Sequence, residues 1–122
     1  MASVLETAIA RARSGQLTMQ SVLWTFAASS LSVPSGADPG ETFTDFQPVL
    51  FPKHDHSMMA VFTSPHEAER VAHLAPFVVA MSGSQLLLQS PATQGLVVNP
   101  SSNLGFDIEP AGIAKFRTEL VP

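Results

Sequence analysis

The chain has 122 residues, of which 45% are hydrophobic and 13% are charged, with a formal net charge of −4 and no cysteine. This length and composition predict one folded domain with a single core and argue against disorder. The acidic balance and the lack of a basic cluster argue against nucleic acid as a partner, and the lack of cysteine excludes disulfides and thiolate catalysis and fits a cytoplasmic location.

Two amphipathic helices are predicted in the N-terminal quarter of the chain. Between Val4 and Ser14, apolar residues recur at helical spacing, and Gly15 is suited to ending that helix. The same periodicity runs from Thr18, a suitable N-cap, to Ala28. Together they predict a helical hairpin whose apolar faces need a surface to cover. The N-terminus lacks the pattern of a signal peptide, and no apolar run approaches the ~18 residues of a membrane span, so we expect no membrane partner.

Short strands follow. Residues 31–33 alternate between apolar and polar and predict a strand, and the proline- and glycine-containing residues 34–42 predict a loop. Residues 49–51 and 58–62 are apolar runs with strand composition, separated by a short polar segment. Two strands with such a connection predict an antiparallel hairpin.

A helix start is predicted after this hairpin. Ser64 is suited to the N-cap, Pro65 to the first helical position, and Glu67 stands three residues after Ser64, as a capping box requires. We expect this helix to run to about Leu74, before Pro76. The residues expected to face inward are Ala68, Val71 and Ala72.

The C-terminal part alternates strands and helices. Residues 77–81 form an unbroken apolar run, which predicts a central strand buried on both faces, and residues 85–89 predict a short helix. Residues 96–98 and 104–108 predict two short strands joined by a turn that is rich in asparagine, proline and serine. Residues 111–119 predict a final helix. The whole pattern predicts an α+β fold: one domain over residues 1–122, with a mixed sheet of about five to six short strands packed against helices.

The only segment with ligand chemistry is His54-Asp55-His56. Side chains alternate along an extended chain, so both imidazoles would point the same way, and imidazole is a good ligand for zinc, copper or nickel. A metal site would need further ligands, for which His66, Glu67 and His73 are the sources. A polar hairpin tip is the favoured interpretation. We therefore expect no metal, and His54, His56 and His66 are only weak candidates.

No catalytic constellation is present in the sequence. Ser82 and Ser84 flank a glycine, but the G-x-S-x-G pattern of a nucleophile elbow is absent. The glycine-rich patterns that bind phosphates are absent as well, and the chain has no tyrosine. We expect a protein that is not an enzyme, with no catalytic residues and no cofactor.

Three stretches resemble a known family. They read AVFTSPHEAER over residues 60–70, GLVVNP over residues 95–100 and LGFDIEPAGIA over residues 104–114. In this order they are similar to the N-terminal domain of the SseB family, named after an enhanced serine sensitivity protein. The resemblance covers most of the chain from the second predicted helix onward. It implies a bacterial α+β domain and offers no catalytic residues.

Three functions remain open at this point. Low charge with 45% hydrophobic residues favours a cytoplasmic protein-interaction or regulatory module that binds a protein partner or forms a homo-oligomer. The second is a domain that binds or senses a small, amino-acid-like ligand in a cleft beside the turn at residues 99–103. The third is a metal protein or enzyme centred on residues 54–56.

Overall fold

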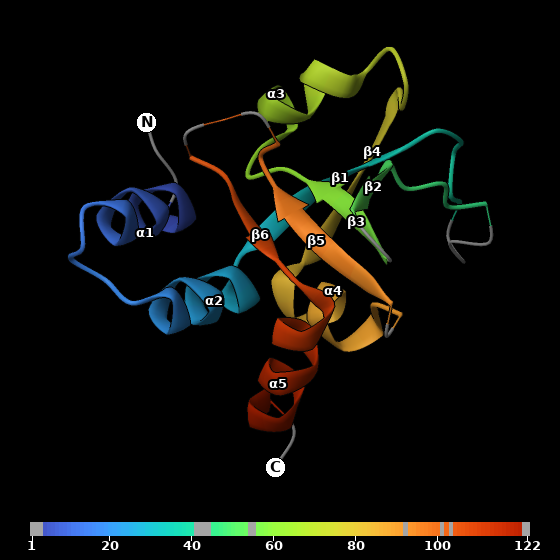
Figure 1. Cartoon of the computed structure of the whole chain (residues 1–122). Helices are drawn as coiled ribbons and strands as arrows, with labels where there is room; N and C mark the ends of the chain where they lie inside the picture. The colour runs from blue at the N-terminus through green and yellow to red at the C-terminus, as the bar shows by residue number, and fades with distance from the viewer. Residues whose placement is uncertain are drawn as a thin grey trace.

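A computed structural model describes residues 4–40, 45–53, 56–91, 93–100, 102 and 104–120. Two helices come first, and strands and helices then alternate toward a C-terminal helix (Figure 1). The helices are α1 (Val4–Arg13), α2 (Met19–Ala28), α3 (Pro65–Ala68), α4 (Gly83–Gln89) and α5 (Pro110–Leu120), with a 3-10 turn, η1 (Glu69–Val71), after α3. The strands are β1 (Ser30–Ser35), β2 (Leu50–Lys53), β3 (His56–Val61), β4 (Phe77–Ser82), β5 (Gln94–Val98) and β6 (Phe106–Ile108).

The predicted N-terminal helical hairpin is confirmed. The Oγ1 atom of Thr18 accepts the backbone N–H of Ser21 at 3.2 Å and so caps α2, as its place before the apolar stripe predicted. The predicted buried faces of the hairpin are apolar and pack into the core, through Leu5 and Ile9 of α1 and Phe26 of α2. Over the described ranges, no helix has both the length and the apolar character needed to cross a bilayer.

Four strands form the larger sheet, in the order β2-β3-β5-β6. Strands β2 and β3 pair antiparallel, as predicted for the hairpin, and β5 and β6 also pair antiparallel, as predicted for the strands around the turn. Strand β5 instead runs parallel to β3. A parallel pair needs a long crossover connection, which here contains β4 and α4. The sheet is therefore mixed, as expected.

Strand β4 corrects one prediction. The unbroken apolar run of residues 77–81 predicted a central strand with both faces covered. In the structure β4 pairs with β1 in a two-stranded sheet, and β1 is its only strand partner among the described residues. Phe77 and Val78 are 42% and 44% exposed. The prediction failed because an apolar run shows that the side chains of a strand are apolar, but it does not show how many strands or helices pack against that strand.

The predicted helix after Ser64 begins correctly and ends early. The Oγ atom of Ser64 accepts the backbone N–H of Glu67 at 3.2 Å, which confirms the cap. The α-helix ends at Ala68 and continues only as the single turn η1. Ala68 is buried as predicted, whereas Ala72 is exposed. The capping residues define a start, and the segment before Pro76 has no comparable stop signal.

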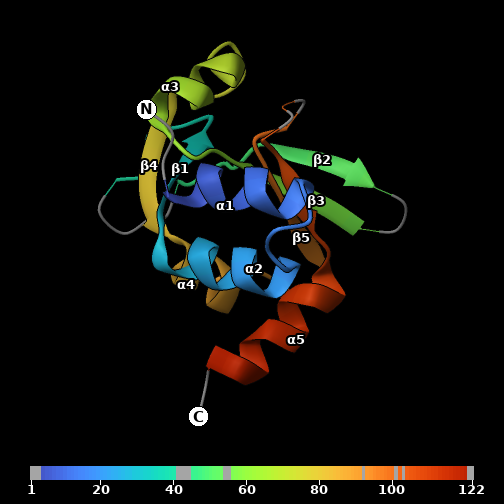
Figure 2. The ribbon, with the colours of Figure 1, turned by 90° about the vertical axis from the view of Figure 1, so that its left-hand side faces the viewer.

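The core lies on both faces of the sheet. Helices α1, α2, α4 and α5 cover one face, and Figure 2 shows α1 and α2 in front of the strands. Side chains of β3 and β5 alternate, so Val61 and Val98 enter this main core. Ala60 and Phe62 enter a smaller cluster with Ala68 of α3 on the opposite face. The result is a layer of helices, a layer of strands and a small α3 layer.

Glycine at position 83 allows close packing of α4 against α2. A Cβ atom built on Gly83 would lie 1.8 Å from the carbonyl oxygen of Phe26. The backbone N–H of Gly83 also donates to Ser29 O at 2.9 Å, directly after α2. The helix pair therefore depends on the absence of a side chain at this position.

Candidate functional site

The turn that follows β5 is organised by Asn99. This residue is 1% exposed and has φ of 49°, in the left-handed region that asparagine tolerates better than most residues. Its Oδ1 atom accepts the backbone N–H of Thr63 at 3.1 Å, and its Nδ2 atom donates to Leu104 O at 3.2 Å. One side chain thus ties the turn both to itself and to the segment before α3.

Close backbone approach shapes the other end of the turn. The N–H of Ser102 donates to Asn99 O and the N–H of Gly105 donates to Ser102 O, each at 3.1 Å. A Cβ atom at Gly105 would lie 2.5 Å from the carbonyl oxygens of both Val98 and Asn99. Only glycine therefore fits where the chain leaves the turn and enters β6.

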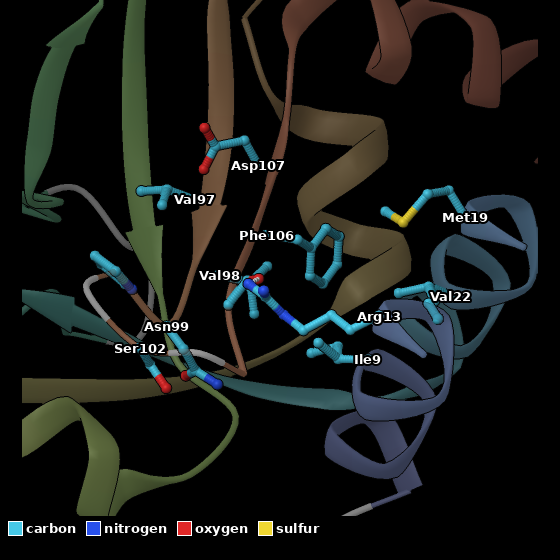
Figure 3. A pocket seen from close by; sticks show the side chains of 13 residues that line it. Ile9, Arg13, Met19, Val22, Val97, Val98, Asn99, Ser102, Phe106 and Asp107 are labelled. Atoms are coloured by element: carbon cyan, nitrogen blue, oxygen red, sulfur yellow. Dashed lines mark hydrogen bonds between the residues drawn. The ribbon is translucent and has the colours of Figure 1, made fainter. Parts of the chain in front are cut away.

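A groove lies beside this turn, between the α1–α2 hairpin and the ends of β5 and β6 (Figure 3). Its volume is about 560 Å³, within the range of roughly 300–1,000 Å³ that is typical of small-molecule sites. The helices contribute Ile9, Ala12, Arg13, Met19 and Val22. The strands and the turn contribute Val97, Val98, Asn99, Pro100, Ser102, Gly105, Phe106 and Asp107. The groove is thus mainly apolar, with polar groups near the turn.

Arg13 spans one end of the groove. It is the last residue of α1, where a cation is favourable beside the negative end of the helix dipole. Its Nη2 atom donates to Gly105 O at 3.0 Å across a sequence separation of 92 residues. Figure 3 shows its side chain reaching across the groove toward Val98. The guanidinium therefore lies beside the turn.

Asp107 lines the groove, but its carboxylate belongs to a separate charged cluster. Its Oδ2 atom lies 3.0 Å from Lys53 Nζ, and the same ammonium group also contacts Glu109 Oε1. The hydrogen bond from Lys53 lowers the pKa of Glu109, and the hydrogen bond to Glu109 raises the pKa of Lys53. The other oxygen of Glu109 lies 2.8 Å from His56 Nε2. This cluster joins the β2–β3 hairpin to the segment before α5.

Of the three histidines named as weak metal candidates, the two that the structure describes have separate partners. His54 and Asp55 lie outside the described residues. His56 contacts Glu109, whereas His66 is exposed on α3 and lies 3.6 Å from Glu69. Among the residues that the structure describes, no three histidine, aspartate or glutamate side chains are grouped so that they could hold a metal ion. The structure thus brings His56 and His66 to different carboxylates.

The two serines considered as nucleophiles serve helix α4 instead. The Oγ atom of Ser82 accepts the backbone N–H of Gln85 at 3.1 Å, and the Gln85 side chain accepts the N–H of Ser82 at 3.0 Å. Ser84 Oγ donates to Ala27 O at 2.8 Å. Both hydroxyl groups therefore have structural roles at the start of α4.

Comparison with protein-family models matches residues 5–115 to the SseB protein N-terminal domain. The chain belongs to this family. The match confirms the predicted resemblance and extends it to α1, so that both walls of the groove lie within the SseB domain. A search of curated proteins and a search of solved structures found no match.

The SseB domain has a second surface of interest, the outer edge of β4. Strand β4 pairs with β1, and Phe62 lies on the side of β1 that faces away from β4. There the N–H of Ser32 donates to Phe62 O at 2.8 Å, and the N–H of Phe62 donates to Ser32 O at 2.9 Å. The backbone of Ser32 thus faces away from β4. Since backbone groups of successive strand residues point to alternate sides, Leu31 and Val33 are the residues that face β4.

The register then identifies which groups of β4 point outward. Leu31 and Val33 lie opposite Met81 and Val79, so the backbone groups of these two β4 residues are directed toward β1. The N–H and C=O groups of Val78 and Ala80 are directed away from β1. Val78 and Ala80 are both exposed. No described residue pairs with these backbone groups, so the outer edge of β4 presents unpaired backbone groups beside apolar side chains.

Sequence reasoning placed the turn correctly and missed the role of Arg13. The sequence marked Arg13 only as a cation at a helix end, because its partner Gly105 is 92 residues away. No local signal connects the two residues. The helical spacing of Ile9 and Ala12 predicts that both lie on the apolar stripe of α1 and that Arg13 lies beside it. This spacing does not indicate which residue Arg13 contacts.

Proposed function

We propose that this SseB domain is a non-enzymatic, cytoplasmic protein-interaction module that forms a homodimer through the outer edge of β4. The observation that carries the proposal is the set of outward backbone groups at Val78 and Ala80 on an exposed strand. The β4 sequence, FVVAMS, contains no charge and no proline, which are two of the features by which natural edge strands prevent pairing.

A second copy is the partner that fits this edge most simply. A two-fold axis beside Val79 would set two β4 strands antiparallel, with Val78 opposite Ala80 of the partner subunit. The outward backbone groups of each strand then satisfy those of the other. The exposed side chains of Phe77 and Val78 would lose contact with water at the same time, which favours association.

Substitution at the edge tests the proposal. Val78→Lys places a charge on the pairing strand and should convert a dimer into a monomer, whereas Leu74→Lys is a matched control, because Leu74 is 59% exposed and lies outside β4. Size exclusion with light scattering measures the mass of each variant. A monomeric wild-type protein, or a Val78→Lys variant that remains dimeric, would contradict pairing through β4.

The groove supports a second candidate function, the binding of a small, amino-acid-like ligand. Its support is the position of a cavity of about 560 Å³ beside the turn where the sequence predicted a cleft. A thermal-shift screen with amino acids, serine included, tests it. Ligand at ~100 times its dissociation constant should add ~2.7 kcal/mol to the free energy of unfolding. An unchanged melting temperature with every amino acid at millimolar concentration would argue against this function.

A further inference from the structure

We infer that the groove beside the Asn99 turn binds a small apolar carboxylate, and that Arg13 binds the carboxylate group. The inference rests on the small-ligand function proposed above and names the chemical class of the ligand. Three features carry it: the hydrogen-bonding capacity of Arg13, the lack of a competing charge in the groove, and the apolar walls.

Arg13 has N–H donors that are available to a ligand. A guanidinium group carries five N–H donors and matches a carboxylate with two parallel hydrogen bonds. Gly105 O receives one of these donors, and Arg13 forms no ion pair with a described residue. In contrast, the ammonium group of Lys53 is shared between two carboxylates. Arg13 is therefore the cation of the groove that is able to bind an added anion.

Asp107 does not neutralise this cation. Side chains alternate along β6, so Phe106 faces the main core and Asp107 faces the opposite side of the sheet, beside Val97. Its carboxylate is bound there by Lys53 at 3.0 Å. Figure 3 agrees, since the Asp107 carboxylate points away from Arg13. Among the described lining residues, the charge that faces the groove is thus positive.

The backbone of Asp107 adds polar groups to the groove. The N–H of Asn99 donates to Val61 O of β3, so the alternate residues of β5, Leu96 and Val98, direct their backbone groups toward β6. Their partners in the register are Ile108 and Phe106. The N–H and C=O groups of Asp107, which lies between them, therefore point away from β5 and toward the groove.

The backbone of the turn offers no free N–H donor for an anion among the described residues. The backbone N–H groups of Asn99, Ser102, Leu104 and Gly105 all donate within the protein. The remaining walls are apolar, with Ile9 and Val22 at the bottom of the groove and Met19, 49% exposed, at its rim. A ligand with a carboxylate at Arg13 and a branched aliphatic tail against these walls fits this distribution.

A matched pair of ligands isolates the carboxylate. The probes are 4-methylpentanoate and 4-methylpentanamide, which have the same shape and differ in charge, titrated into the 15N-labelled full chain and followed by chemical shifts. We expect the acid to bind at least about tenfold more tightly than the amide, because hydrogen bonds to a charged group are the stronger ones. The chemical shifts of the backbone N–H groups of Gly105 and Asp107 should change when the acid binds.

Two variants assign the effect to Arg13. Arg13→Gln should remove the preference for the acid over the amide while leaving the weaker amide binding unchanged. Arg11→Gln removes the same charge from the same helix at an exposed position outside the groove and should keep the preference. Equal binding of acid and amide by the wild type, or an unchanged preference in Arg13→Gln, would overturn the carboxylate inference and leave small-ligand binding intact. No binding of either probe would contradict both.

Discussion

At the scale of single residues, Asn99 links the family-typical segments. Its amide joins the turn to Thr63 of the F-T-S-P stretch and to Leu104 of the L-G stretch. All three segments that resemble the SseB family therefore meet at one buried side chain. A buried amide with all its polar atoms bonded is a strong constraint on local geometry, since an unpaired one is costly.

Val98 gives the sharpest stability prediction at this scale. It is 0% exposed in the main core, so Val98→Asp loses ~1.5–3 kcal/mol of apolar burial and adds the larger cost of a buried carboxylate. We expect this variant to be unfolded by circular dichroism. Val4→Asp is the control: Val4 is 79% exposed, and the effect should stay within about 0.5 kcal/mol. A cooperatively folded Val98→Asp variant would show that β5 is assigned wrongly.

At the scale of elements, the charged cluster joins parts that the hydrogen bonds of the sheet do not connect. Lys53 at the end of β2 contacts Asp107 of β6 and Glu109 directly before α5. Strands β2 and β6 lie at opposite edges of the four-stranded sheet. The side chain of Lys53 thus reaches across the face of two intervening strands and holds the start of α5.

This cluster predicts an acid-sensitive contribution to stability. The pKa of Glu109 is lowered in the folded state, chiefly by the hydrogen bond from Lys53. The stabilisation that Glu109 contributes to the fold is therefore complete above its ordinary pKa of 4.5 and is lost as the pH falls through the folded pKa. Urea unfolding of the wild type should therefore show a decline below pH 4.5 that is smaller in Lys53→Gln. Lys115→Gln, at an exposed position of α5, is the control and should keep the wild-type decline. Identical profiles for Lys53→Gln and the wild type would contradict a role for the cluster.

The elements also show where local signals succeed. Thr18 and Ser64 cap their helices as predicted, because a cap is a contact between residues three positions apart. The predicted length of the helix after Ser64 and the predicted burial of β4 were wrong. Both depend on what packs against the element, and residues 77–81 read equally well as a covered strand or as an exposed edge.

At the scale of the whole molecule, both surfaces discussed above result from how sheets and helices are assembled. The groove exists because the α1–α2 hairpin stands beside β6, the last strand of its sheet (Figure 1). The exposed edge exists because β4 is the outer strand of the separate two-stranded sheet, in which β1 pairs with its inner side. The two sites are thus separate, and the dimer and ligand experiments test them independently.

The sequence alone determined the local pieces of this SseB domain: the helical hairpin, the capped helix start, the β2–β3 hairpin and the turn between β5 and β6. Each depends on residues that are close in the chain, where periodicity and backbone preferences act directly. Only the tertiary structure decided the parallel pairing of β3 with β5, the exposed edge of β4 and the contact of Arg13 with Gly105. These depend on contacts between distant residues, and no local pattern encodes which distant segment a strand or a cation will meet.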